Sequence, residues 1–161
     1  MTIPAKVTPV QNFQIDKYLG KWYEIARLDH RFERDLSNVS AEYLSKKDKG
    51  IQVINRGYNE KSKQWKEIIG RAYFASAPDI GFLKVSFFRP FYGAYIIFEL
   101  DQKNYQYALV SGPSKNYLWI LARTPTLDDA VKSSLIAKAK SLGFDTDSLV
   151  FPSHNQSRNH P

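Results

Sequence analysis

Few side chains in this sequence are suited to acid–base or nucleophilic chemistry. The chain has no cysteine, which excludes thiol nucleophiles, disulfides and Cys-ligated metal sites. Asp29 and His30 form an adjacent acid–base pair, but no serine sits in a Gly-x-Ser-x-Gly turn, the motif that exposes a nucleophilic serine. The other histidines, His154 and His160, fall in the polar C-terminal tail. These patterns argue against an enzyme.

His30 is the remaining candidate for ligating a haem iron or a metal ion. It lies between Asp29 and Arg31 without a second histidine nearby, and a solitary histidine in such a setting is more typical of a surface loop. We therefore expect no cofactor. A haem, pigment or metal carrier acting through His30, or a weak lipid-processing enzyme, stays as the alternative function.

The residues that point to binding are apolar and aromatic, and strands must position them. From Trp22 onward, short runs of alternating apolar and polar residues are separated by turn-forming clusters at nearly regular spacing, which predicts antiparallel strands. The expected strands are residues 21–31, 39–47, 51–59, 65–76, 82–88, 93–101, 105–112 and 116–124. Eight antiparallel strands are enough to close an up-and-down β-barrel that holds one small ligand.

The connections between these runs are short and rich in Gly, Pro, Asn and Asp, so sequential strands should pair. The one longer link, residues 32–38, falls between the first two strands, where it can cross the barrel mouth as a lid.

After the last strand the pattern becomes helical, with Val131, Leu135, Ala139 and Leu142 on one face. We expect Thr126 to cap this helix and its apolar stripe to dock outside the sheet. The sequence is expected to form one domain, residues 1–161: a barrel at about 21–124, a helix at about 127–142, a short strand at about 147–151 and a polar, frayed tail at 153–161.

Strict alternation from the first strand assigns an inward face to each strand. In the first strand it places Trp22, Glu24 and Ala26 inside the barrel, and in the fourth strand we choose Ala72 and Phe74 over Tyr73. Most of the ligand-binding residues expected in the cup are apolar, and Tyr43, Asn55, Tyr95 and Tyr117 are the candidates for hydrogen bonding a polar head group. The full expected set is Ala41, Tyr43, Val53, Asn55, Phe74, Leu83, Val85, Phe87, Tyr95, Ile97, Tyr117, Trp119 and Leu121.

Charge and leader features bear on partners and location. The net charge is +7, yet the basic residues are scattered, as on a solvated surface. The aromatic residues alternate toward the interior, and both features argue against nucleic-acid binding.

The residues from Met1 to Lys6 contain no apolar core of a signal peptide. We expect either a cytoplasmic protein or a mature envelope protein whose leader was replaced by the initiating Met. A monomer or a weak homodimer through Phe88, Phe91 and Tyr92 is compatible with ligand binding.

Two motifs at opposite ends of the predicted barrel carry a family resemblance. The segments 20–27 (Gly-Lys-Trp-Tyr-Glu-Ile-Ala-Arg) and 112–125 (Gly-Pro-Ser-Lys-Asn-Tyr-Leu-Trp-Ile-Leu-Ala-Arg-Thr-Pro), followed by an acid-started helix, resemble the lipocalin family. Within it, the chain is most similar to the bacterial outer-membrane lipocalins related to apolipoprotein D and the plant temperature-induced lipocalins. The resemblance covers about residues 10–151.

The resemblance implies a structural signature of Gly20, Trp22 and Arg123, in which the guanidinium seals the barrel base across the indole. It also implies capture of a hydrophobic small molecule, with a fatty acid or a lysophospholipid as the expected ligand. Membrane association, peripheral or through a lipid anchor, and a location in the periplasm or outer membrane follow from the same resemblance. The family's middle motif is present only loosely, around Asp101 and Tyr105.

Overall fold

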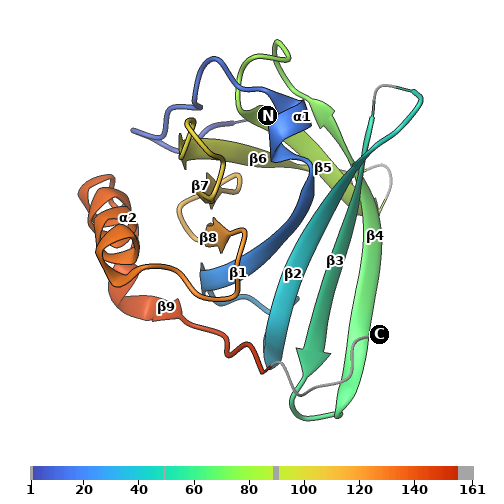
Figure 1. The fold of residues 1–161 in the computed structure, drawn as a ribbon, viewed down its shortest axis with the longest axis vertical. Coiled ribbons are helices and arrows are strands. Elements are labelled where there is room, and N and C mark those ends of the chain that lie inside the picture. Colours follow the sequence, from blue (N-terminus) through green and yellow to red (C-terminus); the bar gives the residue numbers. More distant parts are fainter. Residues whose placement is uncertain (1, 49, 89–90, 156–161) are drawn as a thin grey trace.

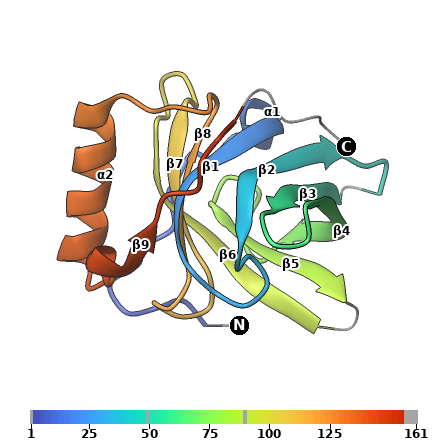
Figure 2. The same cartoon turned by 90° about the horizontal axis from the view of Figure 1, so that it is seen from below.

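The computed structural model describes residues 2–48, 50–88 and 91–155, with the side chains of Phe88 and Phe91 excepted. Its sheet closes on itself in the order β2-β3-β4-β5-β6-β7-β8-β1-β9, and a β1–β2 pairing completes the circle. This confirms the predicted eight-stranded antiparallel barrel, with one helix outside it and a short extra strand (Figures 1 and 2). The strands are β1 (Gly20–Leu28), β2 (Leu36–Ser45), β3 (Ile51–Asn59), β4 (Gln64–Phe74), β5 (Phe82–Phe88), β6 (Phe91–Leu100), β7 (Tyr107–Ser111), β8 (Leu118–Ala122) and β9 (Leu149–Val150). The helices are α1 (Ile15–Tyr18), α2 (Asp129–Ser141) and the 3₁₀ turn η1 (Thr146–Ser148).

The two ends of the barrel differ. Figure 1 shows α1 lying across one end, where Phe13, Ile15 and Leu19 pack into the interior cluster. The β3–β4 hairpin extends from the opposite end (Figure 1). We call the first the closed end and the second the open end.

Two apolar cores lie on the two faces of the sheet. Inside the barrel, Trp22, Val53, Leu83 and Ile97 belong to one continuous cluster of buried side chains. Outside it, α2 buries Leu135 and Ala139 against the outer faces of β1, β6, β7 and β8, as the end-on view of Figure 2 shows. The inner cluster is therefore separate from the packing that holds the helix.

The first strand departs from strict alternation because it contains a β-bulge. The pairing of β1 with β8 shifts between Glu24 and Ala26, and a bulge moves the following side chains to the opposite face. Ala26 consequently belongs to the outer cluster with Ile25, and not to the interior as predicted. Arg27 takes the inward place instead, paired with Trp119 of β8.

Three further details differ from the sequence prediction. Helix α2 is capped by Asp128, whose carboxylate accepts from the Val131 N–H at 3.3 Å, and not by Thr126. The loop between β1 and β2 is residues 29–35, since β2 already begins at Leu36. The start of the tail is docked rather than frayed: His154 Nε2 lies 2.8 Å from the Glu24 carbonyl oxygen. Residues 156–161 of the tail lie outside the described residues.

Candidate functional site

The closed end is sealed by an indole under a guanidinium. Trp22 is fully buried, and its Nε1–H donates to the Tyr18 carbonyl at 2.8 Å. The Arg123 guanidinium carbon lies 3.9 Å from the centroid of the Trp22 ring, a distance at which a cation–π contact stabilises both groups. Gly20 begins the strand beside them with a φ of +99°, a backbone conformation that residues with a side chain rarely adopt.

Arg123 also ties the end of the last barrel strand to the start of the chain. Its Nε donates to the Tyr105 carbonyl at 3.0 Å, Nη1 to the Lys21 carbonyl at 3.1 Å and Nη2 to the Lys17 carbonyl at 2.7 Å. The planar guanidinium thus satisfies carbonyls from three segments at once. The signature residues Gly20, Trp22 and Arg123 meet at this end, and their role in stability stays a prediction.

Three tyrosine hydroxyls form a chain just inside the closed end. Tyr95 Oη lies 2.6 Å from Tyr18 Oη and 2.8 Å from Tyr43 Oη. Burial raises the pKa of Tyr18 and Tyr95 well above the usual value and raises the pKa of Tyr43 to about 12. All three therefore stay neutral phenols at physiological pH. The head-group role expected of Tyr43 and Tyr95 stays a prediction, and their hydroxyls are already partners of each other.

The inner wall contains most of the residues expected to bind ligand. Buried members of the inner cluster are Tyr43, Val53, Leu83, Ile97 and Leu121, and partly buried members are Ala41, Phe74, Val85, Phe87, Tyr95 and Trp119. Two expected residues are not members of this apolar cluster but lie beside members of it. Asn55 is half-buried on β3, between its strand partners Ala41 and Ile68. Tyr117 precedes β8, with its ring 5.6 Å from that of His30 and 6.2 Å from that of Trp119.

At the open end, the β1–β2 loop carries Glu33 inward. Glu33 Oε1 accepts from Trp119 Nε1–H at 2.8 Å and lies 2.8 Å from His30 Nε2. The His30 ring packs edge-on against Trp119 at 5.9 Å. This residue, considered above as a haem or metal ligand, is thus engaged by a carboxylate of its own loop. Over the described ranges, no group of three or more His, Asp or Glu side chains is placed to hold a metal ion.

The bulge in β1 brings a buried ion pair to the same end. Arg27 Nη1 lies 2.8 Å from Glu24 Oε2, and both side chains are almost inaccessible, at 3% and 4% exposure. Arg27 also bonds Asp29 Oδ1 at 3.0 Å and the Glu33 carbonyl at 2.9 Å. Sequence reasoning placed Glu24 inward but missed Arg27 and Glu33. For Arg27 the available signal was a charged residue within an apolar strand, because buried charges require partners. Glu33 lies in a loop, where that signal is absent.

The two carboxyl groups respond differently to this environment. Burial raises the pKa of Glu24 well above its usual range, and the neighbouring Glu33 charge adds to the effect. Burial acts on Glu33 in the same direction, but hydrogen bonds from Glu24, His30 and Trp119 outweigh it and lower the Glu33 pKa to about 2. Glu33 is therefore the carboxylate that holds its negative charge, close to the guanidinium of Arg27.

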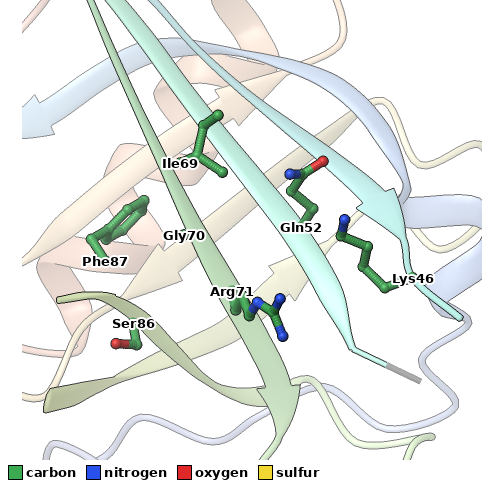
Figure 3. Close-up of a pocket in the computed structure, with 7 residues that line it drawn as sticks. All are labelled: Lys46, Gln52, Ile69, Gly70, Arg71, Ser86 and Phe87. Atoms are coloured by element: carbon green, nitrogen blue, oxygen red, sulfur yellow. The ribbon is translucent and has the colours of Figure 1, made fainter. Parts of the chain in front are cut away.

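A separate hollow of about 370 Å³ lies on the barrel wall and is lined by Lys46, Gln52, Ile69, Gly70, Arg71, Ser86 and Phe87 (Figure 3). It lies at the end of the pairing between β4 and β5, which runs from Arg71–Ser86 to Phe74–Leu83. A Cβ on Gly70 would lie 2.6 Å from the Phe87 ring, so only glycine lets that ring lie against β4. The hollow is built from elements other than the Glu33 loop.

The apolar surface expected to support a homodimer is only partly described. Tyr92 is exposed, and its ring lies 6.4 Å from that of Tyr73 at an interplanar angle of 57°, whereas the side chains of Phe88 and Phe91 lie outside the described residues. In the part of the chain that the structure describes, no helix is both long and apolar enough to cross a lipid bilayer.

Comparisons with known proteins agree with this geometry. The model of the lipocalin-like domain family matches residues 13–154. The chain is 54% identical to the outer membrane lipoprotein Blc of Vibrio cholerae, over 92% of this chain and 87% of that protein. It is 32% identical to temperature-induced lipocalin-1 of Arabidopsis thaliana, over 92% and 83% of the two chains. The solved structure of insecticyanin from the tobacco hornworm Manduca sexta has a similar fold, with a TM-score of 0.74 at 20% identity, covering 97% of this chain and 88% of that one.

Proposed function

This chain belongs to the lipocalin family, whose members bind hydrophobic small molecules, and we propose that it binds and transports or stores a fatty acid or a lysophospholipid inside its barrel. The observation that carries the proposal is the inner wall. Phe74, Val85, Phe87 and Trp119 point into the barrel cluster yet stay only partly buried. Apolar side chains that face inward without being fully covered are typical of a wall that an apolar ligand completes.

The distribution of apolar and charged groups in the interior favours an amphiphile with a single acyl tail. The closed end offers neutral phenols and the indole of Trp22, whereas the charged groups Arg27 and Glu33 gather at the open end. An acyl chain running down the barrel gains about 0.8 kcal/mol per buried methylene, so ten methylenes supply roughly 8 kcal/mol before the costs of association. After those costs, micromolar affinity is the expected scale.

The similarity to proteins named outer membrane lipoproteins supports a location in the cell envelope. A mature domain there, peripheral to a membrane or attached by a lipid anchor, would meet its ligand at a lipid surface. The net charge of +7 favours approach to anionic lipid. We propose that the protein acts there as a monomer or a weak homodimer.

The direct test is stoichiometric binding. Titration of the purified, delipidated protein with a fluorescent polyunsaturated fatty acid should saturate near one per chain, with a dissociation constant on the micromolar scale. Organic extraction of protein purified from its native host, followed by mass spectrometry, should recover a fatty acid or a lysophospholipid. Unlabelled oleate and oleoyl lysophospholipid should both displace the probe.

A short-chain acid such as butyrate is the matched control, because it carries the same carboxylate without the tail. Displacement by butyrate as readily as by oleate would contradict burial of the tail. The absence of both a saturable signal and an extractable lipid would overturn the lipid-carrier proposal.

A further inference from the structure

The open end contains an anion site that the protein fills with its own side chain. The Glu33 carboxylate is held by two donors from different elements, Trp119 Nε1–H on β8 and the ring of His30 in the β1–β2 loop. Its side chain is 16% exposed. A carboxylate reaching back from a loop to donors on the barrel wall occupies the position that an external anion would take.

A buried cation stands behind these donors. Arg27 Nη1 lies 4.0 Å from Glu33 Oε2, beyond hydrogen-bonding distance, while the same nitrogen binds Glu24. The charged groups around the site are Arg27 and Glu24 on β1 together with Asp29, His30 and Glu33 in the loop. Arg27 therefore faces two carboxyl groups, Glu24 of its own strand at 2.8 Å and Glu33 of the loop at 4.0 Å.

Glu33 does not satisfy this site completely. Glu33 Oε1 takes both the Trp119 and the His30 donors, and Oε2 has no hydrogen-bond donor among the described residues other than the Glu24 carboxyl. A carboxyl group donates only while it is protonated, so Oε2 is held by a weaker arrangement than Oε1. An anion that used both oxygens would fit the same donors better.

We propose that the Glu33 side chain occupies the binding site for the anionic head group of the ligand, a carboxylate or a phosphate. When the ligand binds, its head group displaces the Glu33 carboxylate and accepts the hydrogen bonds from Trp119 and His30 beside Arg27. The inference rests on the proposed function, since it assumes that the tail lies in the barrel. Displacement needs only the Glu33 side chain to withdraw, because the Glu33 backbone carbonyl stays bonded to Arg27 Nη2 at 2.9 Å. The neighbouring loop side chain Phe32 is 57% exposed, so the loop has open solvent on its outer side.

An internal competitor lowers the affinity for the molecule that it imitates. The observed dissociation constant is the intrinsic one divided by the fraction of molecules with the site vacated. Removing the Glu33 carboxylate should therefore tighten binding of an anionic amphiphile. It should affect a neutral amphiphile of the same length much less, because a hydroxyl does not compete for the cation.

The experiment compares oleate with oleyl alcohol, each displacing the fluorescent fatty acid from wild type and variants. Glu33→Ala should tighten oleate binding by about tenfold and change oleyl alcohol binding by less than about threefold. Trp119→Phe, which keeps an aromatic ring and removes the N–H, should weaken oleate binding by about tenfold with little change for the alcohol. Glu42→Ala is the matched control, because Glu42 is paired at 3.0 Å with Arg56, away from the loop, and should leave both affinities unchanged.

Glu33→Gln keeps the shape of the side chain and should give an intermediate gain, which covers the case in which Glu33→Ala folds poorly. An arm with oleoyl lysophosphatidate identifies the source of the anion: a gain with it alone assigns the site to phosphate, and a gain with oleate alone assigns it to carboxylate. If Glu33→Ala tightened neither oleate nor oleoyl lysophosphatidate more than the alcohol, or if both Glu33 variants bound both anions more weakly, the proposal that Glu33 occupies the head-group site would be wrong. Failure of wild type to bind either amphiphile would instead overturn the proposed function.

Discussion

The closed and open ends of the barrel both bury polar groups, but they satisfy them differently. At the closed end, the Arg123 guanidinium donates to three backbone carbonyls and the tyrosine hydroxyls bond one another. At the open end, one oxygen of Glu33 takes both the Trp119 and the His30 donors, and the other has only the Glu24 carboxyl as its hydrogen-bond donor among the described residues. A fully satisfied network holds one arrangement, whereas an incompletely satisfied one is easier to exchange. We therefore expect the closed end to contribute stability and the open end to exchange ligand.

The largest expected effect is the loss of folding stability when the Trp22 side chain is removed from the closed end. Trp22→Ala removes a fully buried indole and should lower the free energy of unfolding by about 3 to 5 kcal/mol, measured by denaturant titration. Trp119→Ala is the matched substitution at the other end, where the indole is half-buried. It should weaken fatty acid binding by at least about tenfold and cost less stability than Trp22→Ala. If both changes altered binding alone, the division between the two ends would be wrong.

A smaller loss of folding stability is expected at alkaline pH, and it should arise from the buried tyrosines of the closed end. The folded-state pKa of Tyr43 is about 12 against a usual value near 10. Between these pH values the unfolded chain releases the Tyr43 proton and the folded chain keeps it. The contribution of Tyr43 to the free energy of unfolding is therefore fully present below pH 10 and is lost as the pH rises toward 12. The loss should approach ~1.4 kcal/mol per pH unit for this group.

Denaturant titrations at several alkaline pH values would measure this loss, and Tyr43→Phe should make the slope shallower. Tyr73→Phe is the control, because Tyr73 is a half-buried tyrosine paired with Lys84 on the other face of β4. An unchanged slope in Tyr43→Phe would contradict the assignment of the alkaline loss to the tyrosine chain.

The barrel and its closed end were predictable because their signals are local. Strand periodicity and turn residues define the eight strands, and the two end motifs identify Gly20, Trp22 and Arg123 as a group. The inner wall follows from alternation wherever the strands are regular, as with Ala72 and Phe74, which join the inner cluster.

The open end was less predictable because its geometry depends on one irregularity. A bulge leaves no clear mark in the segment Glu24-Ile25-Ala26-Arg27, and it reverses the faces of the last two residues. The sequence places Glu33 in a predicted lid, but the partners of a loop residue depend on where the loop folds back, which periodicity does not report. The charged residues within the apolar segment of β1 are the one hint that the sequence offers for Arg27.

The orientation of a bound acyl chain tests the division between the two ends most directly. The three tryptophans, Trp22, Trp65 and Trp119, give separate indole N–H signals in a proton–nitrogen NMR spectrum. A stearate carrying a nitroxide near its carboxylate should broaden the Trp119 signal most, and one carrying it near the methyl end should broaden the Trp22 signal most. The reverse pattern, or equal broadening of both by either label, would contradict a head group at the open end and a tail directed toward the closed end.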